Sequence, residues 1–475
     1  MNEESAIIVL GAGPAGLTAA RALSRAGKKV IVLEKESSVG GISSSRRWNG
    51  FITEYGPHTY HLKHDRIDRV IREHYPAALP AKKRITRMLI RGKYFDYPLK
   101  FWQLLRGLNP FFSARMLGDF IYASLKNRLF PRPDNSFAAW GIRRFGKTLY
   151  DLCFGQYTER VWGVPASRLS TRLASQKLHR LNLKDILIKL LGGKGEEQAT
   201  YWEDFLYPEE GMGIIFKNMA SRIRHDGGEV WLQSEAVSSS LESDRLVTIT
   251  VNKEGEEITV PCSAVISTIP LYSLGKLISD YLSPSALEAS RELKNRSLIL
   301  VNLILNVPLV SDAHWVYLLD PFFRFNRFCE QKNLLLEKKP RLKTLITFEI
   351  CCDFKDSLWE KSESELLALV RRDIENIKLI DGRRINDCSV GRVKNAYPIY
   401  DLGFENRLQR LLTSLSGIKN LYSSGRQGLF LNTDMHDSME MGARAAEAAL
   451  KGEESRSWYS GMIPYLDFKT GGTNR

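Results

Sequence analysis

A glycine-rich turn near the amino terminus places the strongest constraint on how this chain can fold. An apolar run over residues 6–10 leads directly into Gly11-Ala-Gly13-Pro14-Ala15-Gly16, and residues 17–26 then have the spacing of a helix. In this order Gly11 makes the turn, Gly13 lets the backbone approach a pyrophosphate, and Gly16 lets the helix pack closely on the strand. The pattern predicts a Rossmann-like βαβ unit whose helix amino terminus holds the phosphates of a dinucleotide.

The end of the next strand narrows the choice of dinucleotide. Residues 29–33 form a second apolar run, which ends at Glu34. A carboxylate at this position would accept hydrogen bonds from an adenosine ribose, and it would repel the 2′-phosphate of NADP. The motif therefore indicates NAD or FAD and does not choose between them.

The charge of the chain is unevenly distributed. The whole sequence of 475 residues carries a net charge of +14, and residues 61–200 hold 27 Lys and Arg against 11 Asp and Glu. No known nucleic-acid motif accompanies this basic stretch, so we expect no nucleic-acid partner. Three interpretations stay open for residues 63–133, which mix aromatic and basic side chains: a peripheral membrane contact, a face that binds an anionic substrate, or a solvated helical surface.

Other features bear on the cellular location. Six scattered cysteines without a CxxC pair favour a reducing compartment. The first apolar run is too short for a signal peptide, and we find no segment that could span a bilayer as a helix. We therefore expect a cytoplasmic protein, and peripheral attachment to a membrane surface stays open as an alternative.

Three further blocks carry a family resemblance. They are Val39-Gly40-Gly41-Ile42-Ser43, Tyr55-Gly56-Pro57-His58, and the late Ser424-Gly425-Arg426 with Asp434-Met435 before a helix-like segment over 438–450. Together with the first turn, these blocks resemble the FAD-binding elements of the amine oxidase, protoporphyrinogen oxidase and UDP-galactopyranose mutase superfamily. The resemblance implies FAD as the cofactor, with the paired glycines behind its ribityl and phosphate portion and Gly425-Arg426 on the other side of the flavin.

The cofactor site that follows from this resemblance draws on both ends of the chain. The last helix would point its amino terminus at the flavin pyrimidine, and the backbone of Val237 would hold the adenine edge. Ile42 departs from the family pattern, in which arginine usually follows the paired glycines. The expected cofactor-binding residues are Gly11, Gly13, Pro14, Ala15, Gly16, Glu34, Lys35, Gly40, Gly41, Ile42, Ser43, Gly56, Pro57, His58, Val237, Gly425, Arg426, Asp434 and Met435.

Candidate catalytic residues come from three interior blocks. In the mutases a Gly-Pro-His block lies against the flavin, which makes His58 the first candidate and His61 the second. The segment 154–165 contains Tyr157, Arg160 and Trp162, which line a substrate cavity or pack in the core, and Arg324 follows a similar aromatic block. The spacing of His58, His61 and His64 invites a metal interpretation, but no complementary Asp, Glu or Cys lies nearby, so we expect no metal.

These observations predict an α/β fold in two parts. A Rossmann-like FAD-binding domain is assembled from the discontinuous segments 1–62, 206–270 and 395–451. An α+β substrate domain is inserted as 63–205 and 271–394, of which 63–200 is helical and basic, and 452–475 forms a C-terminal tail. The leading functional hypothesis is an FAD-dependent oxidoreductase that moves a hydride from a small, possibly anionic, substrate to flavin N5 and is reoxidised by oxygen or a quinone. The alternatives are a non-redox mutase acting on a nucleotide sugar and a flavin-binding scaffold without turnover.

Overall fold

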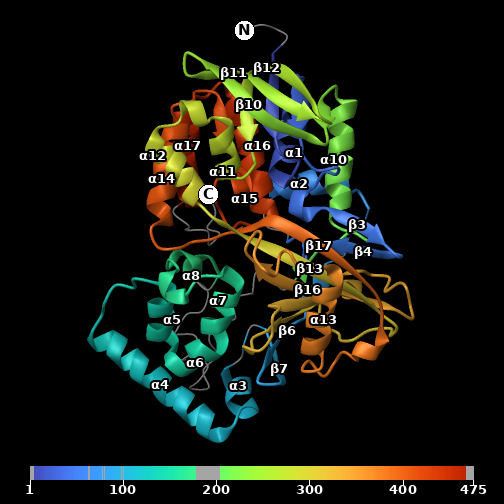
Figure 1. Cartoon of the computed structure of the whole chain (residues 1–475), viewed down its shortest axis with the longest axis vertical. Coiled ribbons are helices and arrows are strands. Elements are labelled where there is room, and N and C mark those ends of the chain that lie inside the picture. The colour runs from blue at the N-terminus through green and yellow to red at the C-terminus, as the bar shows by residue number, and fades with distance from the viewer. Residues whose placement is uncertain are drawn as a thin grey trace.

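Two seven-stranded sheets organise the chain. The computed structural model describes residues 5–61, 65–77, 79, 81–97, 99, 101–177 and 204–466. Figure 1 shows the first sheet with its helices in the upper half, the second sheet below it, and a group of helices beside the second sheet. The architecture is α/β with a Rossmann-like part and a second part, as the sequence predicts.

Separated stretches of the chain build the first sheet. Its strand order is β10-β11-β12-β1-β2-β9, and β18 pairs with β12. The β1–β2, β1–β12, β2–β9 and β12–β18 pairs are parallel, whereas β10, β11 and β12 form an antiparallel meander. Every residue of β1 and β2 is buried, which explains why both are continuous apolar runs. The strands are β1 (Ala6–Leu10), β2 (Val30–Leu33), β9 (Glu229–Trp231), β10 (Ser234–Glu242), β11 (Arg245–Lys253), β12 (Glu256–Ser267) and β18 (Leu421–Ser423).

Helices from the whole length of the chain share a core with this sheet. Residues 271–293, which we expected in the substrate domain, also contribute to this core through α11 and α12. The first core therefore extends beyond the boundary at 270 that the sequence suggests. Its helices are α1 (Pro14–Arg25), α2 (Asp65–His74), α10 (Gly213–His225), α11 (Leu271–Leu277), α12 (Pro284–Glu292), α14 (Phe404–Leu415), α16 (Met435–Lys451) and α17 (Ser455–Leu466).

The second sheet has the order β17-β13-β16-β15-β14-β6-β7 and is antiparallel except between β14 and β6. Helix α13 (Glu363–Ile374) packs its apolar residues into the core of this sheet. Strand β17 runs to Pro398, three residues past the expected domain start at 395. The strands are β6 (Thr86–Ile90), β7 (Lys93–Asp96), β13 (Asn295–Leu305), β14 (Trp315–Leu318), β15 (Arg327–Glu330), β16 (Thr344–Cys352) and β17 (Ile385–Pro398).

The basic insertion is not helical throughout, and this corrects the prediction for residues 63–200. Its first part supplies β6 and β7 to the second sheet, joined by a tight turn in which Arg91 and Gly92 have φ of 50° and 71°. Two consecutive positive φ values are typical of the turn that best matches the twist of a hairpin. Residues 178–203 of the insertion lie outside the described residues. The helices that follow the hairpin are α3 (Phe101–Gly107), α4 (Pro110–Leu129), α5 (Phe137–Phe145), α6 (Lys147–Tyr150), α7 (Gln156–Trp162) and α8 (Arg172–Lys177).

Short elements complete the described chain. The hairpin of β3 (Ser45–Trp48) and β4 (Phe51–Glu54) lies beside the start of α10, and β5 (Lys82–Lys83) pairs with β8 (Asp204–Phe205). The four-residue α15 (Gly425–Gly428) follows β18. Within the described residues, no helix is both long enough and apolar enough to cross a membrane.

Candidate functional site

The glycines of the first turn have separate structural roles. Gly11 has φ of +96°, and a Cβ added to Gly16 would lie 1.9 Å from the carbonyl oxygen of Gly11, so neither position tolerates a side chain. A Cβ on Gly13 would meet no atom within 4 Å. The open space therefore lies at Gly13, the position where the motif predicts a pyrophosphate. Pro14 begins α1 directly after Gly13, where the absent proline N–H costs nothing.

Glu34 closes this turn from the end of β2. One carboxylate oxygen accepts the backbone N–H of Ala12 at 2.8 Å, and the other accepts that of Glu36 at 3.0 Å. The side chain is buried, and burial raises its pKa. Each carboxylate oxygen has more than one acceptor site, so Glu34 can hold the turn and still receive a ribose hydroxyl. The neighbouring Lys35 is exposed.

The paired glycines meet the first turn. Gly40 has φ of +103° and donates its N–H to the carbonyl of Ala12 at 2.8 Å. A Cβ on Gly41 would lie 3.3 Å from the Cα of Gly13. Ile42 and Ser43 complete a short 3₁₀ turn, with Ser43 buried. The structure thus brings two predicted cofactor segments, which are separated in the sequence, into one loop cluster.

The late glycine–arginine block reaches the same place from the other end of the chain. Gly425 has φ of +75°, and its added Cβ would lie 2.7 Å from the Cβ of Ala15. The guanidinium of Arg426 is fixed by the carbonyls of Thr433, at 3.0 Å from Nε, and Ala396, at 3.3 Å from Nη1. Near this edge the buried hydroxyls of Ser267 and Ser424, at the ends of β12 and β18, find no hydrogen-bond partner among the described residues. Unsatisfied polar groups at the carboxyl edge of a parallel sheet fit a site for a polar ligand.

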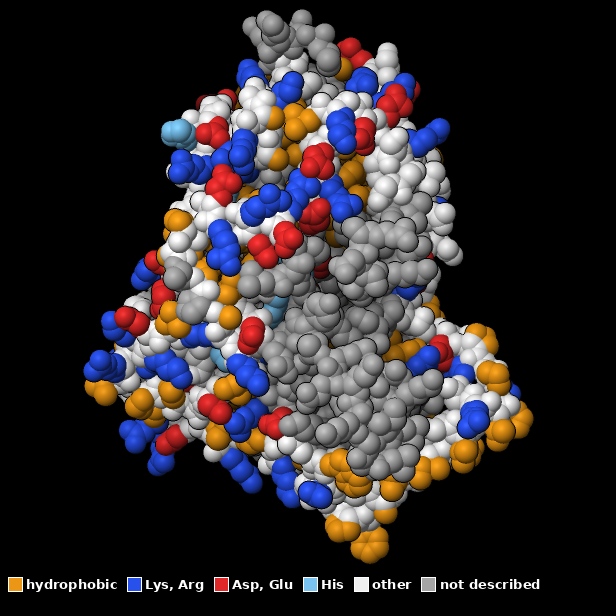
Figure 2. All heavy atoms as spheres, turned by 180° about the vertical axis from the view of Figure 1, so that it is seen from behind, with side chains coloured by type: hydrophobic (Ala, Val, Ile, Leu, Met, Phe, Trp, Pro, Cys, Tyr) orange, Lys and Arg blue, Asp and Glu red, His pale blue; other side chains and the backbone are white. Residues whose placement is uncertain are grey.

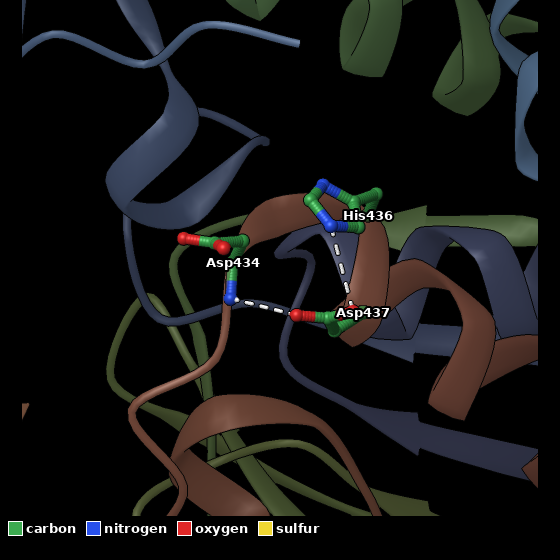
Figure 3. A group of neighbouring side chains, drawn as sticks. All are labelled: Asp434, His436 and Asp437. Atoms are coloured by element: carbon green, nitrogen blue, oxygen red, sulfur yellow. Dashed lines mark hydrogen bonds and ion pairs between the residues drawn. The ribbon is translucent and has the colours of Figure 1, made fainter. Parts of the chain in front are cut away.

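Three side chains at the start of α16 form the one group of possible metal ligands found in the described part of the chain. Asp434, His436 and Asp437 have ligand atoms within 4.8 Å of one another. Figure 3 shows Asp437 bending back, so that one oxygen accepts the N–H of Asp434 at 3.2 Å while the other lies 3.5 Å from Nε2 of His436. Asp434 and Asp437 form a capping box for the helix. Capping explains their placement, so we assign no metal here. Met435 is buried in the first turn.

The Gly-Pro-His block lies against side chains of the second sheet. Gly56 has φ of +107°, and an added Cβ would lie 3.2 Å from Oε1 of Glu349 on β16. Nδ1 of His58 lies 3.0 Å from the carbonyl oxygen of Gly56, which can only accept, so Nδ1 carries the proton and Nε2 is an acceptor. Burial, followed by the charges of Arg426 and Arg327, lowers the pKa of His58 to about 3. His58 is therefore neutral at ordinary pH.

A buried ion pair, which the sequence analysis missed, lies beside this block. Arg327 on β15 and Glu349 on β16 face each other in register, with Nε 2.8 Å from Oε1, and the Glu349 side chain is fully buried. A single charged residue in a strand that is otherwise uncharged and mostly apolar, as in residues 344–352, is the signal that could have revealed it. With Arg426 added, the site holds two guanidinium groups and one buried carboxylate.

Aromatic side chains surround this charged group. Tyr157 on α7 makes an edge contact with Tyr317 at 6.3 Å between ring centroids, and Arg426 lies 5.9 Å from the ring centre of Tyr397. Burial raises the pKa of Tyr157 well above its ordinary value. Trp162 is buried and contacts Tyr397 edge-on at 6.1 Å. Tyr157 also packs against the apolar core of α4 to α6, and Trp162 is part of a second apolar cluster with Phe137 and Tyr150, as the core interpretation requires.

Other predicted residues have different surroundings. Arg160 donates to three backbone carbonyls, those of Leu318, Asp320 and Phe323, so its guanidinium braces a loop. Arg324 is exposed, and His61 bonds the carbonyl of Asp204 at 3.0 Å. These three side chains have structural or surface positions. His64 lies outside the described residues.

Val237 lies on β10, the edge strand of the first sheet, with 39% of its surface exposed. It is the residue skipped by a register irregularity in the β10–β11 pairing, between Ala236 and Ser238. A bulge of this kind leaves backbone groups out of the ladder, which suits the expected contact through the Val237 backbone.

Comparison with known proteins places this geometry in a family. The model of the flavin-containing amine oxidoreductases matches residues 14–450, nearly the whole chain. The chain belongs to this family. Its members are flavin-containing, and the cofactor of this chain is FAD. The fit is visible in the open space at Gly13, the acceptor at Glu34 and the polar edge formed by β12 and β18.

Several relatives share parts of the chain. A probable UDP-galactopyranose mutase of Klebsiella pneumoniae is 26% identical over 194 residues, which cover 39% of this chain and 48% of that protein. A putrescine oxidase of Kocuria rosea is 49% identical over 53 residues, 11% of each chain. The chain spans about half the length, or less, of the curated relatives it matches.

Solved structures extend the likeness to the whole fold. Reduced UDP-galactopyranose mutase superimposes with a TM-score of 0.82 at 20% identity, covering 97% of both chains. Putrescine oxidase bound to putrescine superimposes with a TM-score of 0.65 at 16% identity, covering 94% of this chain and 99% of that one. The same fold thus serves proteins named for different reactions.

Proposed function

We propose that this protein is an FAD-dependent oxidoreductase that removes a hydride from a carbon of a small molecule and passes the electrons to oxygen or a quinone. Bound FAD supplies the two-electron chemistry. The observation that carries the proposal is the position of neutral His58 beside the charges of Arg327 and Arg426, in a turn whose Gly56 lies against Glu349 of the second sheet. The family to which the chain belongs supports the reaction class.

The charges of this site favour reduction of the bound cofactor. Arg327 and Arg426 carry two positive charges, and Glu349 supplies one negative charge. Guanidinium groups held by backbone carbonyls and by a buried partner stabilise negative charge that develops nearby. Because Arg426 already has fixed acceptors, it needs no rearrangement when that charge appears.

His58 is suited to binding and orientation. Its neutral ring exposes Nε2 as an acceptor, which could receive an N–H or O–H of a substrate. With a pKa of about 3, it is a weak base and would not become protonated during turnover at neutral pH. We therefore assign it a positioning role and leave proton removal to other groups.

The tyrosines supply the wall of the site. Tyr157, Tyr317 and Tyr397 offer ring faces and edges that would exclude water and pack against an apolar or aromatic substrate. Their hydroxyls give a few polar contacts for orientation. Such a wall suits a substrate whose reacting carbon lies next to nitrogen or within a ring.

A second candidate is a mutase that acts on a nucleotide sugar without net oxidation. What supports it is the similarity to the Klebsiella relative and to reduced UDP-galactopyranose mutase. What weakens it is the placement of the two arginines expected to face a diphosphate. Arg160 is committed to three carbonyls, and Arg324 is on the surface.

One experiment separates the candidates. The purified flavoprotein is mixed without oxygen with a panel of hydride donors, including primary amines, putrescine and protoporphyrinogen, and then exposed to air. Loss of flavin absorbance with a donor, and its return in air with hydrogen peroxide, supports the oxidoreductase. Ring contraction of UDP-galactopyranose by the chemically reduced protein supports the mutase. A flavin inert in both assays supports a scaffold without turnover.

A further inference from the structure

One face of α4 carries exposed apolar side chains along its whole length. We define the α4 stripe as Phe111, Ile121, Tyr122, Leu125, Leu129 and the adjoining Phe130. Phe111 is 87% exposed, Leu129 69% and Phe130 66%. At about 100° per residue, the five members within the helix fall inside an arc of about 100°. Figure 2 shows hydrophobic side chains following the lower edge of the molecule, where α4 runs.

The opposite face of the same helix is already used. Ser113, Met116 and Phe120 are buried, and Met116 joins the core formed with Phe145 of α5 and Leu149 of α6. The α4 stripe is therefore a second apolar face, and no described part of the chain covers it. An exposed apolar face of this extent marks an interaction surface on a folded protein.

Basic residues border the α4 stripe on both sides. Arg115 and Lys126 follow one edge around the helix, and Arg128 follows the other. The only acidic residue of α4, Asp119, turns inward and accepts the N–H of Thr148 at 3.1 Å as well as its hydroxyl. The outward face thus combines apolar side chains with positive charge alone.

We propose that the α4 stripe docks this protein onto the surface of a membrane that contains anionic lipids. An apolar stripe with cationic borders matches the boundary between acyl chains and anionic headgroups. A symmetric contact with a second copy would bring these cationic borders near one another without a compensating carboxylate. Helix α3, which packs on α4, adds Trp102 with 46% of its surface exposed, a residue type suited to a membrane interface.

A vesicle flotation assay tests the proposal with the full-length flavoprotein. The probes are vesicles of phosphatidylcholine alone and vesicles of equal parts phosphatidylcholine and phosphatidylglycerol, each at low and high salt. We expect the protein to float with the mixed vesicles at low salt, and to bind less to neutral vesicles and at high salt. No flotation with the mixed vesicles at low salt would overturn the proposal.

Matched variants locate the contact. The stripe variant combines Phe111→Ser, Leu125→Ser and Leu129→Ser, and we expect it to lower binding to mixed vesicles by about tenfold or more. The control variant combines Leu342→Ser, Phe322→Ser and Leu336→Ser, which are also exposed but lie elsewhere, and it should bind like the wild type. Equal binding by the wild type and the stripe variant, or equal loss in both variants, would contradict the assignment.

Two further measurements keep the test decisive. Flavin content should be the same in all three proteins, because every substituted side chain is exposed. If the stripe variant fails to retain flavin, the single changes Arg115→Gln and Lys126→Gln replace it, and each should lower binding to mixed vesicles by roughly fivefold. A wild-type dimer that the stripe variant converts to monomer, without vesicle binding, would show that a second copy covers the α4 stripe.

Discussion

At the scale of single residues, Gly13 shows most clearly how the sequence makes room for a cofactor. Its missing side chain faces open space, while the neighbouring Gly11 and Gly16 are required by the protein itself. We predict that Gly13→Val yields a folded protein without FAD, because the added methyl groups occupy the place of the pyrophosphate. Gly461→Val is the control, since Gly461 also faces open space but lies far along the chain on α17. Full flavin absorbance in Gly13→Val would refute the assignment.

The Arg327–Glu349 pair predicts a large effect on stability. Glu349→Gln would leave the guanidinium of Arg327 without its buried counter-charge, and we expect the free energy of unfolding to fall by about 3 kcal/mol. Asp381→Asn, which breaks the exposed pair with Arg383, should cause no measurable change. Urea unfolding of the flavoprotein measures both variants. Equal midpoints for the two variants would mean that the pair contributes little.

Glu54 predicts a dependence of stability on pH. Its Oε1 accepts the hydroxyl of Ser45 at 2.6 Å and the N–H of Met212 at 2.7 Å, and burial raises its pKa from 4.5 to about 7. The folded state therefore binds this proton more tightly than the unfolded state. As pH rises from 4.5 to 7, the free energy of unfolding should fall by about 3 kcal/mol from this group and then stay level.

The variant Glu54→Gln isolates this contribution, because other groups also titrate in the same range. The difference in unfolding free energy between wild type and variant should change between pH 4.5 and 7 and be constant above that range. Glu365→Gln serves as the control, since this exposed carboxyl has its pKa lowered to about 2 by hydrogen bonds to Ser362 and titrates below this range. A difference that is flat with pH would show that Glu54 ionises normally.

Sequence patterns predicted the glycines whose backbone conformation shapes the site, and missed the side chains that meet only when two strands pair. Gly11, Gly13 and Gly41 are recognisable because the conformation they allow is local. Arg327 and Glu349 meet only through the register of β15 and β16, which no local pattern reveals. No local pattern reveals the acceptors of Arg160 either, because they are carbonyls of a segment 158 to 163 residues away.

At the scale of elements, helix α17 packs against strand β18 at the edge of the first sheet. Trp458 donates its Nε1 hydrogen to the carbonyl of Ser423 at 3.0 Å, and Tyr459 accepts the N–H of the same residue at 3.2 Å. The helix thus covers β18 on the side away from β12, so this part of the expected C-terminal tail (452–475) is docked on the first sheet. We predict that Trp458→Ala lowers the free energy of unfolding by about 3 kcal/mol or more, because a large buried side chain is lost.

Trp102→Ala on α3 is the matched control for α17. It removes the same side chain from a position that is 46% exposed, so its cost should be much smaller. Thermal unfolding followed by flavin release compares the two variants. A smaller effect at Trp458 than at Trp102 would contradict the docking of α17 as a structural element.

The hairpin of β6 and β7 shows a case in which the periodicity of apolar residues did not predict the secondary structure. Helix-like spacing dominates the basic insertion, but residues 86–96 join the second sheet through a parallel contact with β14, more than 200 residues later. The strand assignment depends on that distant partner. The α/β class and the position of the first turn were predictable because both rest on short-range spacing, whereas the later cofactor segments were predicted only through the family resemblance.

At the scale of the whole molecule, the site lies where the two sheets meet. The first sheet supplies the first glycine turn and Glu34, the second supplies Arg327 and Glu349, and the Gly56 turn lies against Glu349. The basic charge belongs to the insertion, whose α4 stripe lies at the far edge of the molecule from the first sheet. The molecule thus separates a proposed redox site from a proposed docking surface.

A bound flavin that a donor can reduce is the central prediction. The most direct measurement is the visible absorbance of the purified full-length protein during anaerobic addition of the hydride donors named above. We predict one FAD per chain, bleached by at least one donor and restored by air. A protein purified without flavin, or a bound flavin that no donor reduces while the chemically reduced protein rearranges a nucleotide sugar, would contradict it.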